Sequence, residues 1–278
     1  MRRRPYLWLR RLARRLGYHL VRADYYSPIP DRWDPDLWEH PAEMPGVDLR
    51  LDAAADLLSE LAPYIAEYAP PAEAPGTKHG FHYLNYLYPQ MDAEMLYAMV
   101  RHVRPRRLVE IGAGWSSRVI ADAVDHAAPV EHRIFDPFPA DHMASLGASV
   151  ERLPAQEVPA GIFAGLEGGD MLVIDTTHTI TPGGDVVRLI LEVLPRLAPG
   201  VIVHVHDIFL PYSYPEFTYH NGLFWQEQWL VQALLACSDR FEVIMANYAM
   251  SRLRSDAVAR AGLGREVAGS ALWLRVAG

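Results

Sequence analysis

Two carboxylates and two imidazoles stand at the ends of apolar runs in the second half of the chain. One run ends at Asp175, with His178 three residues later, and another ends at the pair His206 and Asp207. If these runs are neighbouring parallel strands, their ends meet at the sheet edge where open α/β folds bind ligands. Carboxylates suit Mg²⁺ or Mn²⁺, and an imidazole among them shifts the preference towards Mn²⁺, Fe²⁺ or Zn²⁺. The sequence predicts one polar crevice there.

Each of these residues also has a structural explanation. Asp175 can cap a following helix, and a single histidine is more often structural than a ligand. His204 lies inside its apolar run, so we assign it no chemistry. The functional interpretation is favoured for His206 and Asp207, because the pair ends a strand beside Asp175.

A glycine turn precedes this crevice. In LVEIGAGWSS, Gly112 and Gly114 let the backbone bend and a ligand approach closely, and the amides of the following helix face that ligand. A dinucleotide fingerprint requires a third glycine where Ser117 stands, and Glu110 would repel a pyrophosphate but attract a cation. The turn therefore disfavours an NAD-dependent oxidoreductase.

The next apolar run, HRIFD, ends at Asp136. A carboxylate at that strand end can accept two hydrogen bonds from a ribose diol. The alternative is an aspartate that caps a helix or a turn. Glu110 and Asp136 together are more specific than either acid alone.

These residues need a sheet covered by helices to position them. Apolar runs and helical periodicities alternate from residue 108 onward, which indicates parallel strands with helices on both faces. We expect strands at residues 108–112, 132–136, 171–175, 201–207, 241–247 and 271–278, and helices at 52–68, 92–103, 116–124, 184–197 and 224–237. Residues 25–41 are expected to form a connector without regular structure.

Composition limits the class of protein. The net charge of the 278 residues is −8, which argues against a dedicated nucleic-acid surface. The single cysteine, Cys237, excludes a disulfide within the chain and fits a reducing cytoplasm. No apolar run is long enough to span a bilayer.

The arginine-rich start, MRRRPYLWLRRLARRLG, has helical periodicity, with Leu9, Leu12 and Leu16 on one face. One interpretation is a peripheral contact of a basic amphipathic helix with an anionic membrane surface. The other, favoured because the apolar stripe is short, is a helix packed on the domain or on a second subunit of a homo-oligomer.

The motifs VEIGAGWSS, FDPFP, DMLVIDTTHT and VIVHVHDIFLP resemble class I S-adenosylmethionine-dependent methyltransferases, from about residue 83 to the C-terminus. The resemblance implies a Rossmann-like α/β fold, a doubly wound, mostly parallel sheet of seven strands with an antiparallel last strand. It also implies a methyltransferase domain at 81–278 after an N-terminal helical extension at 1–80. The cofactor-binding residues it implies are Glu110, Gly112, Gly114, Ser116 and Asp136, with Tyr83 and Asn85 in the segment that often covers the cofactor.

The two polar strand ends resemble those of metal-dependent O-methyltransferases of the catechol and macrolide-sugar type. The resemblance implies that Asp175, His206 and Asp207 bind a divalent metal and that His178 is the general base. This family usually has an acid at the place of His206. The implied reaction is deprotonation of a metal-bound hydroxyl by His178, followed by in-line attack on the sulfonium methyl.

The loop after Asp207 is rich in aromatic and polar side chains and is expected to bind a small-molecule or glycan acceptor, such as a sugar or a natural product. Its candidate residues are Tyr212, Tyr214, His220 and Trp225. Three alternatives stay open: N-methylation, a non-haem iron hydroxylase in which His178 is a ligand, and a membrane-associated scaffold without activity.

Overall fold

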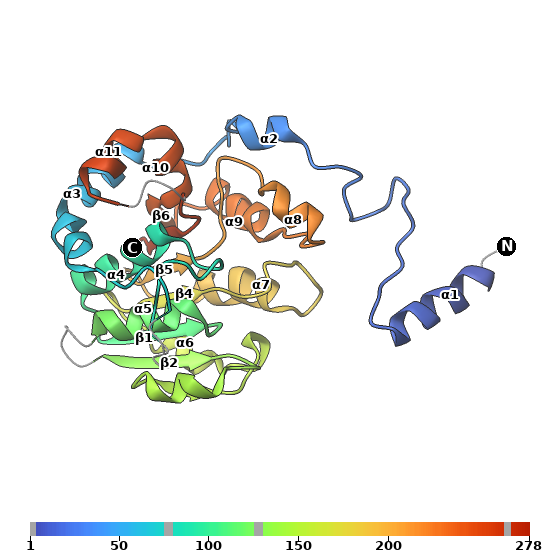
Figure 1. The fold of residues 1–278 in the computed structure, drawn as a ribbon, viewed down its shortest axis with the longest axis horizontal. Helices are drawn as coiled ribbons and strands as arrows, with labels where there is room; N and C mark the ends of the chain where they lie inside the picture. The colour runs from blue at the N-terminus through green and yellow to red at the C-terminus, as the bar shows by residue number, and fades with distance from the viewer. Residues whose placement is uncertain (1–3, 75–79, 125–129, 264–267) are drawn as a thin grey trace.

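The computed structural model describes residues 4–74, 80–124, 130–263 and 268–278. Its strands form one sheet in the order β3-β2-β1-β4-β5-β7-β6 (Figure 1). The strands are β1 (Arg107–Ile111), β2 (Glu131–Phe135), β3 (Ser149–Glu151), β4 (Met171–Ile174), β5 (Ile202–Val205), β6 (Phe241–Ala246) and β7 (Leu272–Val276).

The direction of the strands confirms the expected fold. β1 to β5 pair in parallel, and β7 runs antiparallel to both β5 and β6. The expected strands all form, and the last of them is the antiparallel one. The sequence prediction missed β3, because its three residues are too short for an apolar pattern and none is fully buried.

Helices cover both faces of the sheet (Figure 1). The α-helices of the described residues are α1 (Arg4–Arg15), α2 (Pro35–Glu39), α3 (Leu51–Glu67), α4 (Gln90–Val103), α5 (Trp115–Val124), α6 (Ala160–Ala164), α7 (Asp185–Arg188), α8 (Glu216–His220), α9 (Glu227–Ala236), α10 (Asn247–Leu253) and α11 (Ser255–Arg260), of which α1 lies apart from the sheet (Figure 1). A π-helical turn at Leu189–Val193 continues α7. None of the described helices is both long and apolar enough to cross a membrane.

Two apolar cores lie on opposite faces of the sheet because alternate residues of each strand point to opposite sides. On β4, Leu172 packs with the α7 side and Val173 with the α3, α4 and α5 side. Helix α3 lies before the expected domain boundary at residue 80, and its Leu58 and Leu61 are fully buried in the second core. Helix α3 therefore belongs to the same core as the sheet.

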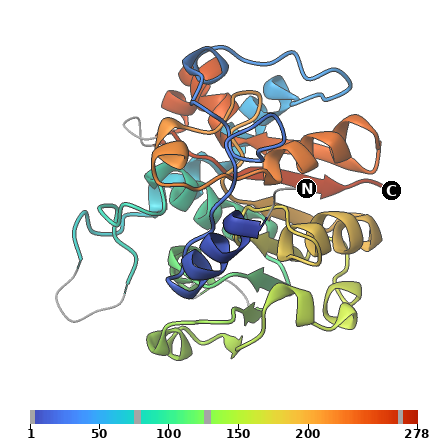
Figure 2. The same cartoon turned by 90° about the vertical axis from the view of Figure 1, so that its right-hand side faces the viewer.

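The N-terminal segment extends away from this body. Figure 1 shows α1 apart from the sheet and its helices, joined by an extended connector, and Figure 2 shows the same helix from its own side. The expected connector includes one short helix, α2, because Asp34 caps it by accepting a hydrogen bond from the Asp36 amide at 3.1 Å. The connector returns to the body at Trp33, whose Nε1 donates to the Tyr214 carbonyl.

Candidate active site

The glycine turn after β1 packs directly against the end of β4. Gly112 has φ +93°, and a Cβ there would overlap the carbonyl oxygen of Asp175. Only glycine fits this contact, since both the backbone conformation and the space exclude a side chain. A Cβ at Gly114 would meet no atom of the described residues within 4 Å. The turn is therefore closed towards Asp175 at Gly112 and open at Gly114.

Glu110 stabilises this turn through hydrogen bonds with the serines that follow it. Its carboxylate is fully buried, accepts hydrogen bonds from Ser116 Oγ (2.7 Å) and Ser117 Oγ (3.0 Å), and lies 2.9 Å from His132 Nε2. Both oxygens are thus engaged within the protein. Glu110 and Ser116 shape the start of α5, and a direct contact of either with a cofactor stays a prediction.

Asp136 lies at the end of β2, on the other side of the turn. One carboxylate oxygen accepts a hydrogen bond from the Ala113 amide at 2.8 Å, and the other from the Phe138 amide at 2.6 Å. The side chain is half-buried, so its oxygens also face the space beside the turn. This position is the one expected for a ribose-binding acid.

Tyr83 and Asn85 precede α4. The Tyr83 hydroxyl donates to Glu94 at 3.1 Å. Asn85 donates twice through its amide nitrogen, to the carbonyls of His82 and Tyr88, and accepts twice through its amide oxygen, from the amides of Leu87 and Tyr88. These bonds use every donor and acceptor position of an Asn side chain. Asn85 holds its own loop together, and its expected cofactor contact stays untested.

The ends of β4 and β5 bring the four predicted polar residues into one crevice. His178 Nε2 lies 3.4 Å from Asp175 Oδ1 and 3.4 Å from Asp207 Oδ2. His206 Nδ1 lies 3.8 Å from the same Asp175 oxygen and 3.6 Å from the same Asp207 oxygen. His178 and Asp207 both have φ +56°, an uncommon conformation outside glycine that the surrounding structure must enforce. The expected cluster is therefore present.

A buried carboxylate stands behind each imidazole. Glu227 Oε2 accepts a hydrogen bond from His178 Nδ1 at 2.8 Å, which leaves Nε2 facing the crevice. Asp92 Oδ2 lies 3.3 Å from His206 Nε2, and the His206 ring stacks on Tyr88 at 4.6 Å. Glu227 and Asp92 are both fully buried. The two histidines are therefore fixed in orientation from behind.

Sequence reasoning did not place either carboxylate. The helix expected from Asp92 begins at Gln90, so Asp92 lies within the first turn of α4 and not before it. The Asp92 carboxylate accepts from Asn247 Nδ2 and the amides of Ser270 and Ala271. No local pattern reports such a contact, because its partners lie about 150 or more residues away along the chain.

The carboxylates decide the protonation of this cluster. Burial alone would lower the pKa of His178, but Asp175, Glu227 and Asp207 outweigh it and raise the pKa to about 10. Burial also opposes ionisation of Asp175, yet the two imidazoles lower its pKa to about 2. The pKa of His206 is raised as well, against burial, by Asp207 and Asp175. Both histidines are cationic at neutral pH in this arrangement.

The metal site predicted from the sequence is not formed here. Within the described ranges, no group of three or more His, Cys, Asp or Glu side chains is arranged to hold a metal ion. Of the three predicted ligands, His206 pairs with the other two, with its Nδ1 at 3.8 Å from Asp175 and 3.6 Å from Asp207. As placed, the four side chains pair with one another and do not fit a divalent ion, so the metal stays a prediction.

His204 is buried one layer below, as expected for a structural histidine. It is 1% exposed, packs edge-on against Trp273 at 4.5 Å, and burial lowers its pKa to about 3. It is neutral. Among the ion pairs of the described residues, those to the crevice carboxylates involve His206 and His178 and not His204. Its role is packing.

A cavity of about 270 Å³ is lined in part by the loop that packs against His178, and His178 itself is not one of its lining residues. Trp225 forms its near wall, with its ring 4.7 Å from the His178 ring, and the Gln226 amide donates to the His178 carbonyl at 2.8 Å. Other walls come from Tyr214 of the same loop, from Trp229 of α9, and from Trp33 of the N-terminal connector. Aromatic faces therefore line this space, and Trp225 is one of the lining residues that contact the candidate base.

Two of the four acceptor candidates line this cavity and two do not. Tyr214 and Trp225 lie in its walls. Tyr212 is buried against Tyr248, and the exposed His220 contacts Glu216 on its own helix at 3.1 Å. The aromatic composition of the loop predicted the wall, but only the fold distinguishes the aromatics that line it from those that pack beneath it.

Residues 109–208 match the family model of a methyltransferase domain. An uncharacterised protein of Archaeoglobus fulgidus is 25% identical over 169 residues, which are 55% of this chain and 76% of that protein.

Solved structures with a similar fold include a methyltransferase of Podospora anserina bound to S-adenosylhomocysteine (16% identical, TM-score 0.46, 80% of this chain and 88% of that chain). Another is an O-methyltransferase of Streptomyces achromogenes involved in tomaymycin synthesis, in complex with S-adenosylmethionine (18%, TM-score 0.39, 80% and 89%). Identities this low do not carry an acceptor or a mechanism from one chain to another.

Proposed function

We propose that this chain is a class I S-adenosylmethionine-dependent methyltransferase and that it methylates a hydroxyl oxygen of a sugar or another hydroxylated natural product. The observation that carries the proposal is the crevice: His178 Nε2 stands between Asp175 and Asp207. The glycine turn touches Asp175 on one side, and the aromatic cavity begins at Trp225 on the other. Cofactor and acceptor would meet over His178.

The cofactor fits the turn by shape and by charge. Gly114 leaves space for the methionine part of S-adenosylmethionine, and Asp136 would accept hydrogen bonds from its ribose. Around the two imidazoles stand four carboxylates, those of Asp92, Asp175, Asp207 and Glu227. Their field favours a sulfonium cation over the neutral product, which supports both binding of the cofactor and release of S-adenosylhomocysteine.

The proton would move to His178. An acceptor hydroxyl in the crevice would donate its hydrogen bond to Nε2 of the neutral form of His178, which takes the proton. Glu227 holds Nδ1–H and stabilises the resulting imidazolium. The alkoxide oxygen attacks the methyl carbon in line, so that the new C–O bond forms as the S–C bond breaks. Since the pKa of His178 is about 10, the neutral form becomes more abundant as the pH rises.

The acceptor class follows from the cavity. Aromatic rings such as Trp225 and Trp33 suit the C–H faces of a sugar ring or the plane of a phenol, and its hydroxyl would point to His178. N-methylation stays the alternative, because a base could also deprotonate an ammonium acceptor and free its lone pair for attack.

Titration calorimetry with S-adenosylhomocysteine tests the cofactor, and mass spectrometry of a panel of hydroxylated acceptors incubated with S-adenosylmethionine tests the transfer. We expect cofactor binding and methylation at oxygen. No cofactor binding, or transfer to nitrogen alone, would contradict the proposal.

The predicted divalent metal is tested by chelation. Turnover that is lost on chelation and then restored by Mg²⁺ or Mn²⁺ supports the metal, and turnover that chelation does not change excludes it.

A further inference from the structure

The N-terminal helix presents an uncovered apolar face. Trp8, Leu12 and Leu16 follow one another at four-residue spacing, and their exposed fractions are 59%, 45% and 67%. Among the described residues, the hydrogen bonds of residues 6–20 stay within that segment. Figures 1 and 2 show α1 apart from the sheet and its helices. The rest of the described chain therefore does not cover this face.

The same helix carries charge of one sign only. Eight of the 26 Lys and Arg residues lie within residues 1–22, and none of the 34 Asp and Glu residues does. The rest of the chain is strongly acidic. Helices that pair with protein partners commonly mix both signs, whereas an apolar stripe between arginines is the pattern of a helix lying in a bilayer interface.

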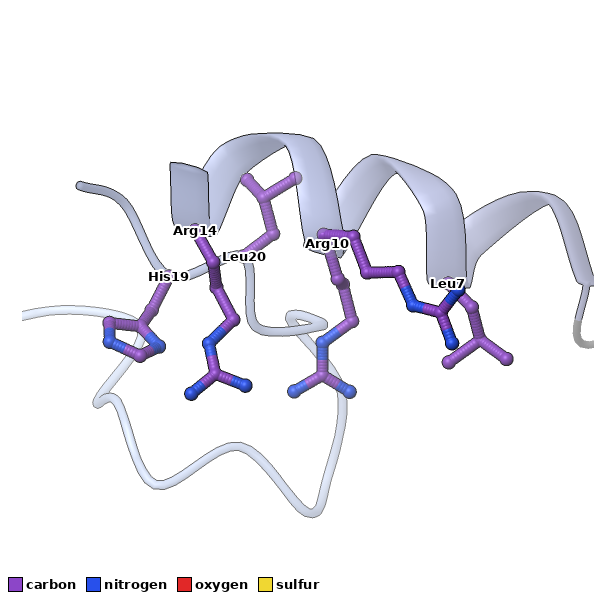
Figure 3. A pocket seen from close by; sticks show the side chains of 6 residues that line it. Leu7, Arg10, Arg14, His19 and Leu20 are labelled. Carbon is purple, nitrogen blue, oxygen red and sulfur yellow. The ribbon is translucent and has the colours of Figure 1, made fainter. Parts of the chain in front are cut away.

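The arginines also form a pocket. Arg10, Arg11 and Arg14 of α1 line a cavity of about 430 Å³ together with His19 of the segment that folds back on the helix. Figure 3 shows the side chains of Arg10 and Arg14 side by side, projecting to the same side, with His19 next to Arg14. Two guanidinium groups one helical turn apart match the phosphate of a lipid headgroup.

We propose that α1 docks this protein on the surface of an anionic lipid bilayer, with Trp8, Leu12 and Leu16 in the interface and the arginines on the phosphates. The connector that follows α1 continues into the wall of the aromatic cavity, through Pro28, Pro30 and Trp33. Docking of α1 thus keeps that cavity close to the membrane surface. The proposal is independent of the chemistry of the crevice.

Co-sedimentation of the full chain with vesicles tests this docking. We expect binding to phosphatidylcholine vesicles that contain phosphatidylglycerol and no binding to pure phosphatidylcholine. Binding should weaken steeply with added salt, because surface charges are screened. The triple substitution Arg10→Ala, Arg11→Ala, Arg14→Ala should lower the partition coefficient on the order of 100-fold. Each arginine is expected to contribute a factor of about ten or less to this coefficient.

A matched control removes three exposed arginines of the body, with Arg106→Ala, Arg152→Ala and Arg260→Ala, and should leave vesicle binding unchanged. The pair Trp8→Ser and Leu12→Ser keeps the charge and should still weaken binding, since the apolar face is lost. Circular dichroism and thermal unfolding of every variant verify the fold. Equal binding to neutral vesicles, equal effects of the two triple substitutions, or a dimer that α1 holds together without binding vesicles would overturn the proposal.

Discussion

His178 has two ring nitrogens in different surroundings, and that difference gives each a separate role. Nδ1 is fixed by the buried Glu227, and Nε2 faces Asp175 and Asp207 in the crevice. The side chain cannot turn over without losing the contact with Glu227, whose burial makes an unpaired carboxylate costly. A base presented by this residue is therefore preorganised.

Replacement of His178 by alanine should lower turnover by about 10²- to 10⁴-fold, because the group that takes the proton is removed. Affinity for S-adenosylhomocysteine should not fall, since the glycine turn is untouched. Steady-state kinetics with an identified acceptor and calorimetry measure the two effects. Turnover equal to that of the unsubstituted protein would exclude His178 as the base.

The pH dependence of turnover should follow the pKa of His178, with a rate that rises from pH 7 towards 10. Glu227→Gln removes a carboxylate that raises this pKa, so the rising limb should move to lower pH. Glu216→Gln, at an exposed carboxylate beside His220, is the matched control and should leave the profile in place. Profiles that coincide for all three proteins would contradict the assignment of Glu227.

At the scale of elements, the turn between β1 and α5 connects the cofactor side to the crevice. Gly112 has no room for a side chain because β4 ends against it, whereas Gly114 borders open space. Gly112 thus serves the protein's own packing, and under the proposed function Gly114 serves the approach of the cofactor. Substitution by alanine is therefore expected to have different consequences at Gly112 and at Gly114.

Gly112→Ala should lower the free energy of unfolding by roughly 2–4 kcal/mol, through both the left-handed φ and the overlap with Asp175. Gly114→Ala should change it by less than about 1 kcal/mol but weaken S-adenosylhomocysteine binding roughly tenfold or more. Urea denaturation and calorimetry separate the two outcomes. A stable Gly112→Ala, or a Gly114→Ala that binds normally, would refute this division of roles.

The whole molecule combines an acidic body with a basic arm. The crevice carboxylates belong to a body whose net charge is negative, and the arginines of α1 extend away from it (Figure 1). The ion pairs of the crevice also contribute to global stability, since the protonation of His178 and Asp175 differs between the folded and unfolded states.

The pKa of His178 is raised in the folded state, so its contribution to stability is complete below about pH 6.5 and is lost as the pH rises through 10. Asp175 has a lowered pKa, so its contribution is present above about pH 3.8 and is lost as the pH falls through 2. The free energy of unfolding should therefore fall by roughly 1–2 kcal/mol between pH 7 and 9. Urea denaturation at both values measures it, and a constant free energy would show that His178 is not paired as described.

The sequence by itself determined the type of fold and the edge of the sheet at which the crevice lies. Alternating strands and helices give a parallel sheet, and parallel strands bring Asp175 and His206–Asp207 to one edge whatever the details of packing. The glycine turn is equally local, because its residues are neighbours in the chain. Hydrophobic periodicity and turn-forming residues act over a few neighbouring residues, so a short stretch of sequence is enough to predict their effect.

Only the tertiary structure decided what stands behind and beside these residues. Asp92 and Glu227 reach the histidines from helices distant in sequence, and together with Asp175 and Asp207 they make both imidazoles cations. Tyr214 and Trp225 line the cavity, while Tyr212 packs beneath it. Protonation and access depend on burial and on charges brought together by long-range packing, and no short stretch of sequence contains that information.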